Sequence, residues 1–388
     1  MGEIPTDFTL LQVTPELETG GAEQTTLDVA AAVVRAGGRS LVASRGGRMA
    51  ARLEASGARL LSMPVNSKNP LVIVDNARRL AGVIRREKVS VVHARSRAPA
   101  ISALWAARAT GTPFVTTYHG VYNARTALKR FYNSVMTRGD LVIANSAYTH
   151  DQVLAKYAID PKRVVTIPRG VDLERFDPGQ VADDRVDLLR SVWGVAADDP
   201  RTKFLLGGRL TRWKGQAVLI EAAARLKAAG EDRFLVLMAG DDQGRAGYRQ
   251  ELERAIAAHG LGDNVKLVGH CGDMPAAYLL ADLACAPSLD PEPFGRTAVE
   301  PQAMGRPVLA ADHGAACETV IPGETGWLVA PRDAEAWTKA LKAAIDTPPE
   351  RLAEMGRAGQ ARSRRLYSVE TMCEATLDVY RRVLGAQS

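Results

Sequence analysis

The sequence contains no uninterrupted apolar run of the roughly 18 to 20 residues that a membrane-spanning helix needs. Its first residues, Met-Gly-Glu-Ile-Pro-Thr-Asp, lack the basic segment that opens a secretory signal peptide. We therefore expect the protein in the cytoplasm. The four cysteines form no Cys-x-x-Cys and have no histidine partner at metal-ligand spacing. We expect Cys271, Cys285, Cys317 and Cys373 to be small buried apolar side chains.

Several nucleotide- and metal-binding motifs are also missing. The sequence has no Gly-x-Gly-x-x-Gly fingerprint, which argues against a dehydrogenase, and no Gly-Lys-Ser/Thr phosphate loop. It also has no Asp-x-Asp, an arrangement by which many enzymes hold a divalent cation on a diphosphate. We therefore expect neither a metal nor another cofactor.

The length of 388 residues is too great for one ordinary core and favours two domains. The net charge of +6 is unevenly distributed, with +10 through residue 175 and −4 in the remainder. Basic stretches such as 85–88 and 129–132 could attract anionic lipid headgroups or a phosphorylated acceptor. Solvated helix faces are the alternative explanation for each stretch. We expect no nucleic acid partner.

Short β-branched or leucine-rich runs alternate with longer amphipathic stretches along nearly the whole chain, a pattern typical of βαβ units. It predicts an α/β protein with two Rossmann-like doubly wound domains. The segment Pro168–Asp172 and the Pro-Gly at 178–179 interrupt regular structure, so we place the linker there. The expected domains are 1–172 and 173–365, with a C-terminal helix over 366–388 that crosses back to the first domain.

Two glycines follow the first expected strand. Gly20 and Gly21 precede an apolar-periodic helix, where backbone amides and the helix dipole favour an anion or a hydroxyl. The same dipeptide is also typical of a plain tight turn. His119 stands at the carboxyl end of the run 114–117, where open α/β sheets bind ligands. A structural histidine bonded to a nearby carbonyl is the alternative.

A basic loop follows the first strand expected in the second domain. Arg209 and Lys214 lie five positions apart, between that strand and the next helix, and they suit a diphosphate whose charge must be neutralised. The alternative is a solvated loop whose basic residues are incidental.

The segment 287–308 carries the most specific pattern. Glu292 lies in the loop after an expected strand, and Glu300 lies about two turns into the helix that should start near Phe294 or Gly295. A carboxylate that accepts two hydrogen bonds from a vicinal diol commonly binds ribose. The free amides of Phe294, Gly295 and Arg296 are available to sugar hydroxyls or phosphate.

The order of these parts resembles glycosyltransferase family 4, whose members are retaining enzymes with the GT-B fold of two Rossmann-like domains facing a cleft. The likeness runs over nearly the whole chain. It includes Gly20-Gly21-Ala22-Glu23, Tyr118-His119-Gly120, Asn145-Ser146, Arg209 with Lys214-Gly215, and Glu-Pro-Phe-Gly-x-x-x-x-Glu at 292–300. The sequence departs from the family at Arg169, where asparagine is frequent, and at Pro301, where a small residue is frequent.

The resemblance implies a role for each matching residue. Glu300 is expected to bind ribose, Glu292 the donor sugar, and Arg209 with Lys214 the pyrophosphate, while His119 approaches the sugar. Arg169 and Asp172 could contact ligand from the hinge, or they could form an ion pair that stabilises the hinge. The expected catalytic residues are His119, Arg209, Lys214 and Glu292. The expected donor-binding residues are Gly20, Gly21, Arg209, Lys214, Glu292, Phe294, Gly295, Arg296, Thr297 and Glu300.

The resemblance further implies transfer of a hexose from a UDP- or GDP-sugar, with retention and without a metal, to a lipid-linked or lipopolysaccharide-type glycan of the cell envelope. The protein would then be cytoplasmic or peripheral on the inner face of the membrane, with the basic first domain against anionic lipid. A non-hydrolysing sugar-nucleotide epimerase and a non-catalytic nucleotide-sugar-binding protein are the alternatives.

Overall fold

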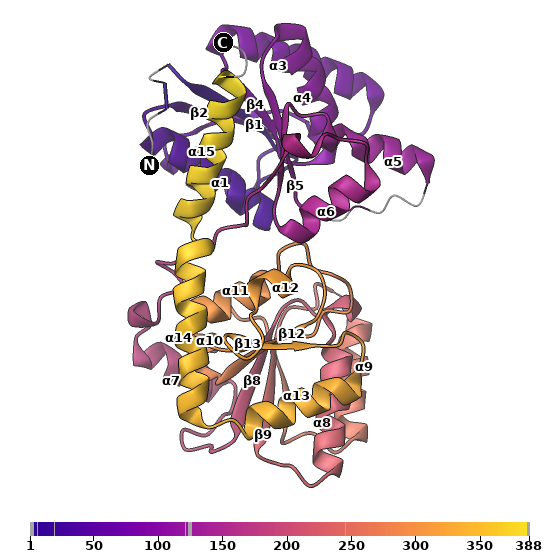
Figure 1. Cartoon of the computed structure of the whole chain (residues 1–388), viewed down its shortest axis with the longest axis vertical. Helices are drawn as coiled ribbons and strands as arrows, with labels where there is room; N and C mark the ends of the chain where they lie inside the picture. Colours follow the sequence, from indigo (N-terminus) through magenta and orange to yellow (C-terminus); the bar gives the residue numbers. More distant parts are fainter. Residues whose placement is uncertain are drawn as a thin grey trace. The chain divides into compact units, whose positions relative to one another are not determined.

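The computed structural model describes residues 4–5, 7–18, 20–120, 122, 126–244 and 246–385. The chain forms two compact units (Figure 1). Unit 1 comprises Met1–Gly170 with Val369–Ser388, and unit 2 comprises Val171–Ser368. The expected boundaries stood at residues 172 and 365. Within the described residues, each unit contains one wholly parallel sheet, of seven strands in unit 1 and six in unit 2, which confirms the predicted fold class.

The sheet of unit 1 has the order β3-β2-β1-β4-β5-β6-β7. Its strands are β1 (Thr9–Val13), β2 (Arg39–Ser44), β3 (Arg59–Ser62), β4 (Val91–Ala94), β5 (Phe114–Tyr118), β6 (Leu141–Ala144) and β7 (Val164–Thr166). Its helices are α1 (Gly21–Arg35), α2 (Ala50–Ala55), α3 (Pro70–Glu87), α4 (Arg97–Thr110), α5 (Ala127–Asn133), η1 (Ser134–Thr137), α6 (Ala147–Lys156), η2 (Pro161–Arg163) and α15 (Val369–Gly385). The central strands β1, β4 and β5 are buried at every position, because helices cover both faces of a parallel sheet.

Helix α15 belongs to unit 1 although it ends the chain (Figure 1, yellow). Its apolar face packs against α1 and the sheet through buried residues that include Cys373, Leu377 and Tyr380. The Tyr380 ring stacks on Phe8, and its hydroxyl lies 2.7 Å from Nδ1 of buried His93. The helix therefore completes the core of unit 1 and satisfies a buried polar group there.

The sheet of unit 2 has the order β10-β9-β8-β11-β12-β13. Its strands are β8 (Thr202–Gly207), β9 (Phe234–Ala239), β10 (Val265–Gly269), β11 (Leu283–Ala286), β12 (Val308–Ala311) and β13 (Gly326–Val329). Its helices are η3 (Pro178–Gln180), α7 (Asp183–Val192), η4 (Arg212–Lys214), α8 (Gln216–Ala228), α9 (Ala246–Ala258), α10 (Met274–Leu280), α11 (Arg296–Ala303), α12 (Ala316–Thr319), α13 (Ala334–Ile345) and α14 (Pro349–Leu366). The run 114–117, expected to lead to His119 at a carboxyl end, lies within β5.

The prediction about the cysteines was partly wrong. Cys285 and Cys373 are buried, whereas Cys271 is half-buried and Cys317 is exposed. Cys317 lies in α12, a four-residue helix whose outer side faces solvent. Its thiol donates to Oδ1 of Asp312 at 3.3 Å. Tertiary packing decides whether a side chain in a short surface helix is buried. The spacing of the cysteines in the sequence does not reveal that packing.

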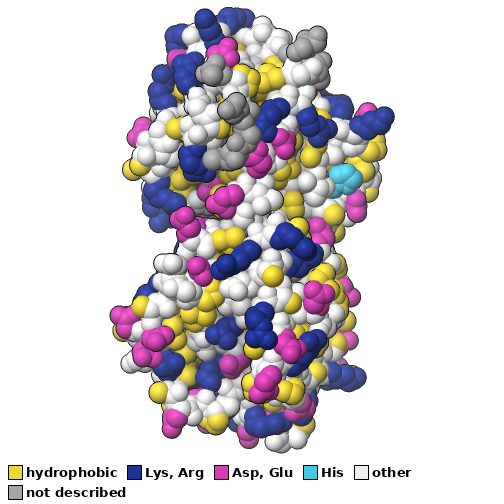
Figure 2. Space-filling model, turned by 60° about the vertical axis from the view of Figure 1, so that its left-hand side comes forward, with side chains coloured by type: hydrophobic (Ala, Val, Ile, Leu, Met, Phe, Trp, Pro, Cys, Tyr) yellow, Lys and Arg dark blue, Asp and Glu magenta, His cyan; other side chains and the backbone are white. Residues whose placement is uncertain are grey.

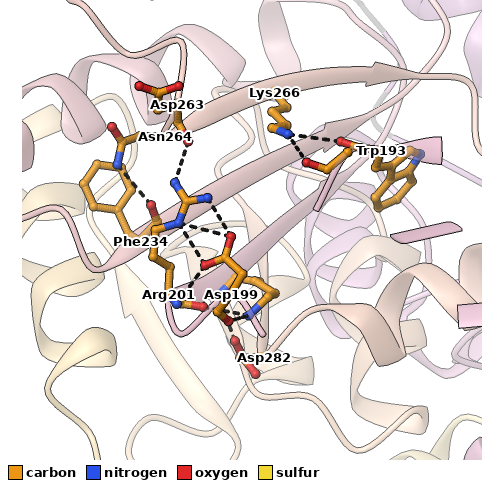
Figure 3. Close-up of polar contacts among 10 residues, drawn as sticks. Trp193, Asp199, Arg201, Phe234, Asp263, Asn264, Lys266 and Asp282 are labelled. Atoms are coloured by element: carbon orange, nitrogen blue, oxygen red, sulfur yellow. Dashed lines mark hydrogen bonds and ion pairs between the residues drawn. The ribbon is translucent and has the colours of Figure 1, made fainter. Parts of the chain in front are cut away.

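Charged residues tie together the edge of the second sheet at which the strands begin (Figure 3). Arg201, just before β8, donates two hydrogen bonds of 2.6 and 2.9 Å to the carboxylate of Asp199 and a third to the carbonyl of Asp263. Asp282, just before β11, accepts at 2.8 Å from the amide of Lys203. These contacts occupy the edge opposite the one where ligands bind in such sheets, so we assign them to stability.

A second carboxylate of unit 2 is bound in the same way. Glu231, which follows α8, accepts from Arg233 at 2.6 Å, and Arg233 also pairs with Asp346 at the end of α13. Hydrogen bonds from Arg201 and Arg233 lower the pKa of Asp199 and of Glu231 to about 2. Both carboxylates are nearly buried, with side chains 6% and 7% exposed.

These two shifts predict an acid-dependent loss of stability. An unfolded carboxyl group titrates near pH 4, so the folded state binds fewer protons between about pH 5 and pH 2. The stability that each carboxylate contributes is complete above about pH 5 and is lost as the pH falls toward 2. We expect Asp199→Asn and Glu231→Gln each to lower the free energy of unfolding by about 1 to 2 kcal/mol at pH 7. Denaturant unfolding across this pH range measures it.

The matched control is Glu221→Gln, which removes a solvent-exposed (i, i+4) partner of Arg225 on α8. Exposed ion pairs contribute little to the free energy of unfolding, so this variant should unfold like the wild type. The assignment is contradicted if the two test variants keep the full acid dependence of the wild type between pH 5 and pH 2.

Candidate functional site

Two loops meet at the edge of the second sheet where the strands end. The first runs from β8 to α8 and contains η4, and the second runs from β11 to α11. The amide of Leu289 donates to the carbonyl of Trp213 at 2.6 Å. Gly215 has φ +80°, and a Cβ there would lie 1.9 Å from the carbonyl oxygen of Pro287. Only glycine permits this contact, which holds Lys214 beside the loop that carries Glu292.

Lys214 and Glu292 form an ion pair, with Nζ 2.7 Å from Oε1 and side chains 11% and 15% exposed. Glu292 also accepts from the hydroxyl of Ser288 at 2.5 Å. Nζ of Lys214 lies 4.6 Å from the centre of the Trp213 ring, a cation–π distance. The ammonium is therefore held in place, close to the start of α8, by contacts on two sides.

A small pocket opens beside this ion pair, with a volume of about 10 Å³, enough for about one water molecule. The hydroxyl of Thr297 is buried and has no hydrogen-bond partner among the described residues. The amide end of α11, with Gly295 as its N-cap at φ +77°, lies at the same pocket. The lining residues are Ala286, Ser288, Glu292, Gly295, Thr297, Ala298, Ala311, His313 and Ala316.

Glu300 lies on α11, whose first residue is Arg296. It is therefore little more than one turn from the helix start, rather than the two turns expected. Arg296 donates to Oε1 of Glu300 at 2.6 Å, and the Tyr278 hydroxyl donates to Oε2 at 3.5 Å. Burial raises the pKa of Tyr278 well above its usual range, and the Glu300 charge adds to the rise. Tyr278 thus remains a hydrogen-bond donor to this carboxylate.

Pro301 lies inside α11 and the helix continues past it to Ala303. A proline has no amide proton, so the helix lacks the hydrogen bond that position 301 would donate. The side chain of Gln302 donates to the carbonyl of Ala298 at 2.8 Å and to that of Thr319 at 2.9 Å. These bonds fix the second half of α11 and with it the position of Glu300.

Two expected donor-binding residues, Arg209 and Phe294, have side chains that point away from the Lys214–Glu292 ion pair or into the core. Arg209 is exposed, and its guanidinium donates to Gln243 at 3.4 Å; among the described residues it has no hydrogen bond to Lys214 or Glu292. The Phe294 side chain is 3% exposed and packs edge-on against Tyr367 in the core. Only the backbone of Phe294 is thus available to a ligand, because its ring anchors the loop.

The predicted residues of unit 1 also lie at a carboxyl edge. Nη2 of Arg169, after β7, lies 3.1 Å from Nδ1 of His119, after β5. A Cβ at Gly21 would lie 2.3 Å from Nη1 of Arg169, and one at Gly20 would lie 2.4 Å from the Glu23 carboxylate. The glycine pair therefore lets charged side chains approach the start of α1.

His119 is neutral in this environment. Burial lowers its pKa well below the usual range, and the charges of Arg169 and Arg95 lower it further. Since guanidinium only donates, Nδ1 accepts from Arg169, and we infer that the proton is on Nε2. Nε2 is buried and has no hydrogen-bond partner among the described residues. It is a donor available to a hydroxyl or an oxyanion.

Sequence reasoning missed Arg95. This guanidinium follows β4, is 1% exposed, and donates to Gln12 at 2.8 Å and to Thr117 at 3.4 Å. Its Nη2 has no partner among the described residues. In the sequence, Arg95 directly follows a short apolar run, as the last residue of Val-His-Ala-Arg. A charged residue at that position is expected at the edge where the strands end, so this position could have identified Arg95 as a candidate site residue.

Ser288 and His313 were missed as well. His313 follows β12, and its Nε2 donates to the carbonyl of Ser288 at 2.8 Å.

Asp172 was predicted to contact a ligand from the hinge, but its carboxylate accepts from the amides of Glu174 and Arg175 and closes a local turn. In the described part of the chain no cluster of three or more His, Cys, Asp or Glu could hold a metal ion.

The N-terminal and C-terminal parts of the chain match two different family models. The model described as Glycosyltransferase Family 4 matches residues 19–175, and the model described as Glycosyl transferases group 1 matches residues 192–362. A curated relative, D-inositol 3-phosphate glycosyltransferase 1 from Catenulispora acidiphila, is 32% identical over 287 residues, covering 69% of this chain and 67% of that protein. Across the relatives of that name, the matched part spans about half to two thirds of their length.

Solved structures resemble the whole chain. The crystal structure of a glycosyltransferase from Rickettsia africae ESF-5 has a TM-score of 0.89 and 33% identity, covering 97% of this chain and 98% of that one. The structure of Anabaena Alr3699/HepE in complex with UDP and glucose has a TM-score of 0.81 and 24% identity, covering 97% and 100%. At 24% identity, the likeness to Anabaena Alr3699/HepE shows a shared fold.

The close contact at Gly215 predicts a large effect for one methyl group. Gly215→Ala should cost about 3 kcal/mol or more, because the left-handed backbone strain adds to an overlap with Pro287. We also expect loss of ligand binding at this site, since the overlap separates the two loops that carry Lys214 and Glu292. Thermal unfolding and ligand binding measure the two effects.

Gly230→Ala is the matched control. Gly230 also has φ +80°, but open space surrounds its Cβ position, so this variant should cost only about 1 kcal/mol. Equal destabilisation by both substitutions would mean that the contact between the loops does not matter.

Proposed function

Since this chain belongs to glycosyltransferase family 4, we propose that it transfers a hexose, with retention, from a UDP- or GDP-sugar to a lipid-linked or lipopolysaccharide-type glycan acceptor. The observation that carries this proposal is the cluster of Lys214, Glu292 and the start of α11 at the carboxyl edge of unit 2. It combines a fixed cation, the carboxylate that pairs with it and a helix N-terminus in one place.

The donor would bind along this cluster. Its diphosphate would lie against the ammonium of Lys214, which then exchanges part of its pairing with Glu292 for phosphate. Glu300, which contacts Arg296 and Tyr278, would accept hydrogen bonds from the ribose hydroxyls. Arg209 would have to turn away from Gln243 to reach the diphosphate, so we assign it a secondary role. Anabaena Alr3699/HepE, which shares the fold, was solved with UDP and glucose, which supports a donor of this class.

Lys214 and the N-terminus of α8 would stabilise the leaving nucleoside diphosphate as the bond to the anomeric carbon breaks. In a front-face route the departing phosphate oxygen takes the proton of the acceptor hydroxyl, and that hydroxyl oxygen bonds the anomeric carbon on the same face. The reaction would then need no metal, because side-chain cations and helix termini would neutralise the phosphate. Neutral His119, with a free Nε2–H, would donate to a sugar hydroxyl without adding a charge.

The acceptor would bind to unit 1 through a negatively charged group. Arg95 supports this part, since its guanidinium is buried and one of its nitrogens has no partner among the described residues. A lipid-linked glycan phosphate suits this group. Inositol phosphate suits it also, and the curated relatives are named for that acceptor rather than for lipopolysaccharide, so it is our second candidate.

Mixing the protein with UDP- and GDP-sugars distinguishes the proposal from its alternatives. A glycosyltransferase releases free nucleoside diphosphate and labels the acceptor only when an acceptor is present. An epimerase converts the donor without any acceptor, and a binding protein does neither.

A membrane acceptor would place the enzyme in the cytoplasm, at the inner face of the membrane. No helix among the described residues is both long and apolar enough to cross that membrane.

The role of Lys214 predicts a specific kinetic change. We expect Lys214→Ala to lower kcat about 100- to 1000-fold while the donor KM changes far less, because the cation acts mainly on charge that develops as the diphosphate leaves. Steady-state release of nucleoside diphosphate measures both constants. An unchanged kcat would contradict the role.

Two further variants make this test specific. Arg212→Ala removes a neighbouring cation that pairs with Glu251 at the surface, and it should keep the wild-type kcat. Lys214→Ala leaves Glu292 without its cation, so stability can fall for that reason alone. The double variant Lys214→Ala/Glu292→Gln removes that unpaired charge, and we expect it to regain stability but not activity.

A further inference from the structure

Arg169 differs from the basic side chains on the surface of unit 1. On the face drawn in Figure 2, dark blue Lys and Arg side chains are spread over unit 1 (upper part), with magenta acids among them. Arg169 is half-buried, and its Nη2 lies 3.1 Å from Nδ1 of His119. The two residues follow β7 and β5, and β6 lies between those strands in the sheet. The contact therefore requires a long side chain at position 169.

The start of α1 leaves space for the same guanidinium. A Cβ at Gly21 would lie 2.3 Å from Nη1 of Arg169. Gly21 is the first residue of α1, and its φ lies outside the left-handed region, so its backbone suits any residue. The side chain is therefore missing at position 21 for reasons of space and not of backbone conformation. One arm of the guanidinium fills this space while the other meets His119.

This contact selects one form of the imidazole. A guanidinium only donates, so Nδ1 of His119 accepts and Nε2 carries the ring proton. Nε2 is buried and has no hydrogen-bond partner within the described part of the chain. A neutral imidazole without that donor could carry its proton on either nitrogen, and a proton on Nδ1 would make Nε2 an acceptor. Arg169 thus decides whether His119 donates or accepts at Nε2.

Several charged or titratable groups surround this imidazole on the neighbouring elements. They are Arg169, Arg95, His93, Tyr122 and, on α1 beside Gly20, Glu23. Burial lowers the pKa of His119, and the charges of Arg169 and Arg95 lower it further. Burial also lowers the pKa of His93 and raises that of Tyr122, so both of these side chains are neutral. Removing Arg169 therefore removes one of two positive charges near the ring.

We propose that Arg169 is a positioning residue, which holds the His119 ring in one orientation with its proton on Nε2 and acts on ligand only through that proton. The inference rests on the transferase proposed above, in which Nε2–H of His119 donates to a sugar hydroxyl. It replaces the direct ligand contact that the sequence suggested for Arg169. The glycine at position 21 has a matching purpose, because it gives the guanidinium its place.

Nitrogen NMR of the imidazole tests the tautomer on the full chain with neither donor nor acceptor present. We expect His119 to carry its proton on Nε2 alone at about pH 7, with the signals assigned by their loss in His119→Asn. Arg169→Met removes the donor and its charge, so it should give both tautomers and move the titration of His119 to higher pH. Arg169→Lys keeps a charged donor and should keep the proton on Nε2.

Gly21→Ala is an independent variant that leaves every charge in place. Its Cβ would displace the end of a flexible side chain, so we expect the same mixture of tautomers with little change in unfolding temperature. The matched control is Arg78→Met at an exposed position of α3, which should keep the wild-type NMR signals. A proton on Nε2 alone in both Arg169→Met and Gly21→Ala would overturn the proposal.

Kinetics separate an action through His119 from direct contact with ligand. His119→Asn removes the donor at Nε2 and should lower kcat/KM about tenfold, the effect of one lost hydrogen bond. Arg169→Met should lower it by a similar or smaller factor, and the double variant should be no slower than His119→Asn alone. Factors that multiply in the double variant would show that Arg169 contacts ligand itself, which overturns the proposal. Failure of the transferase proposal would leave the NMR result unchanged, so the two can be distinguished.

Discussion

The ion pair between Lys214 and Glu292 depends on a close contact of two backbones. Gly215 and Pro287 approach so closely that no side chain fits between them, and this contact sets the distance between the basic loop after β8 and the acidic loop after β11. A nearly buried ammonium and carboxylate then satisfy each other at 2.7 Å. A ligand that replaces this pairing must bring its own charge, which favours a diphosphate over an uncharged sugar.

Opposite edges of each sheet carry different chemistry. In unit 2 the edge where strands end holds Lys214 and Glu292, whereas the edge where strands begin is tied by Arg201, Asp199 and their neighbours (Figure 3). The second set has its hydrogen-bonding groups already paired, which makes it a source of stability. In unit 1 the strand-start edge is different: among the described residues, Arg108 pairs with the Asp140 carboxylate, whereas Arg163 donates to backbone carbonyls.

Much of the fold could be predicted from the sequence, because parallel strands buried on both faces appear as short apolar runs with no polar alternation. Two doubly wound domains, and a loop with Glu292 that leads into a helix with Glu300, both followed from local patterns. The cluster of Lys214 and Glu292 was predictable in kind, since both residues follow strands, and the ends of parallel strands meet at one edge.

By itself, the sequence determined which residues stand at strand ends and which helix starts have free amides, because these depend on local periodicity and on glycine and proline. Tertiary structure alone decided how they pair. Lys214 contacts Glu292 while Arg209 turns to Gln243, the Phe294 ring enters the core, and Arg95 is buried without a carboxylate partner among the described residues. These outcomes depend on contacts between residues far apart in the chain, and no local pattern encodes the distance between them.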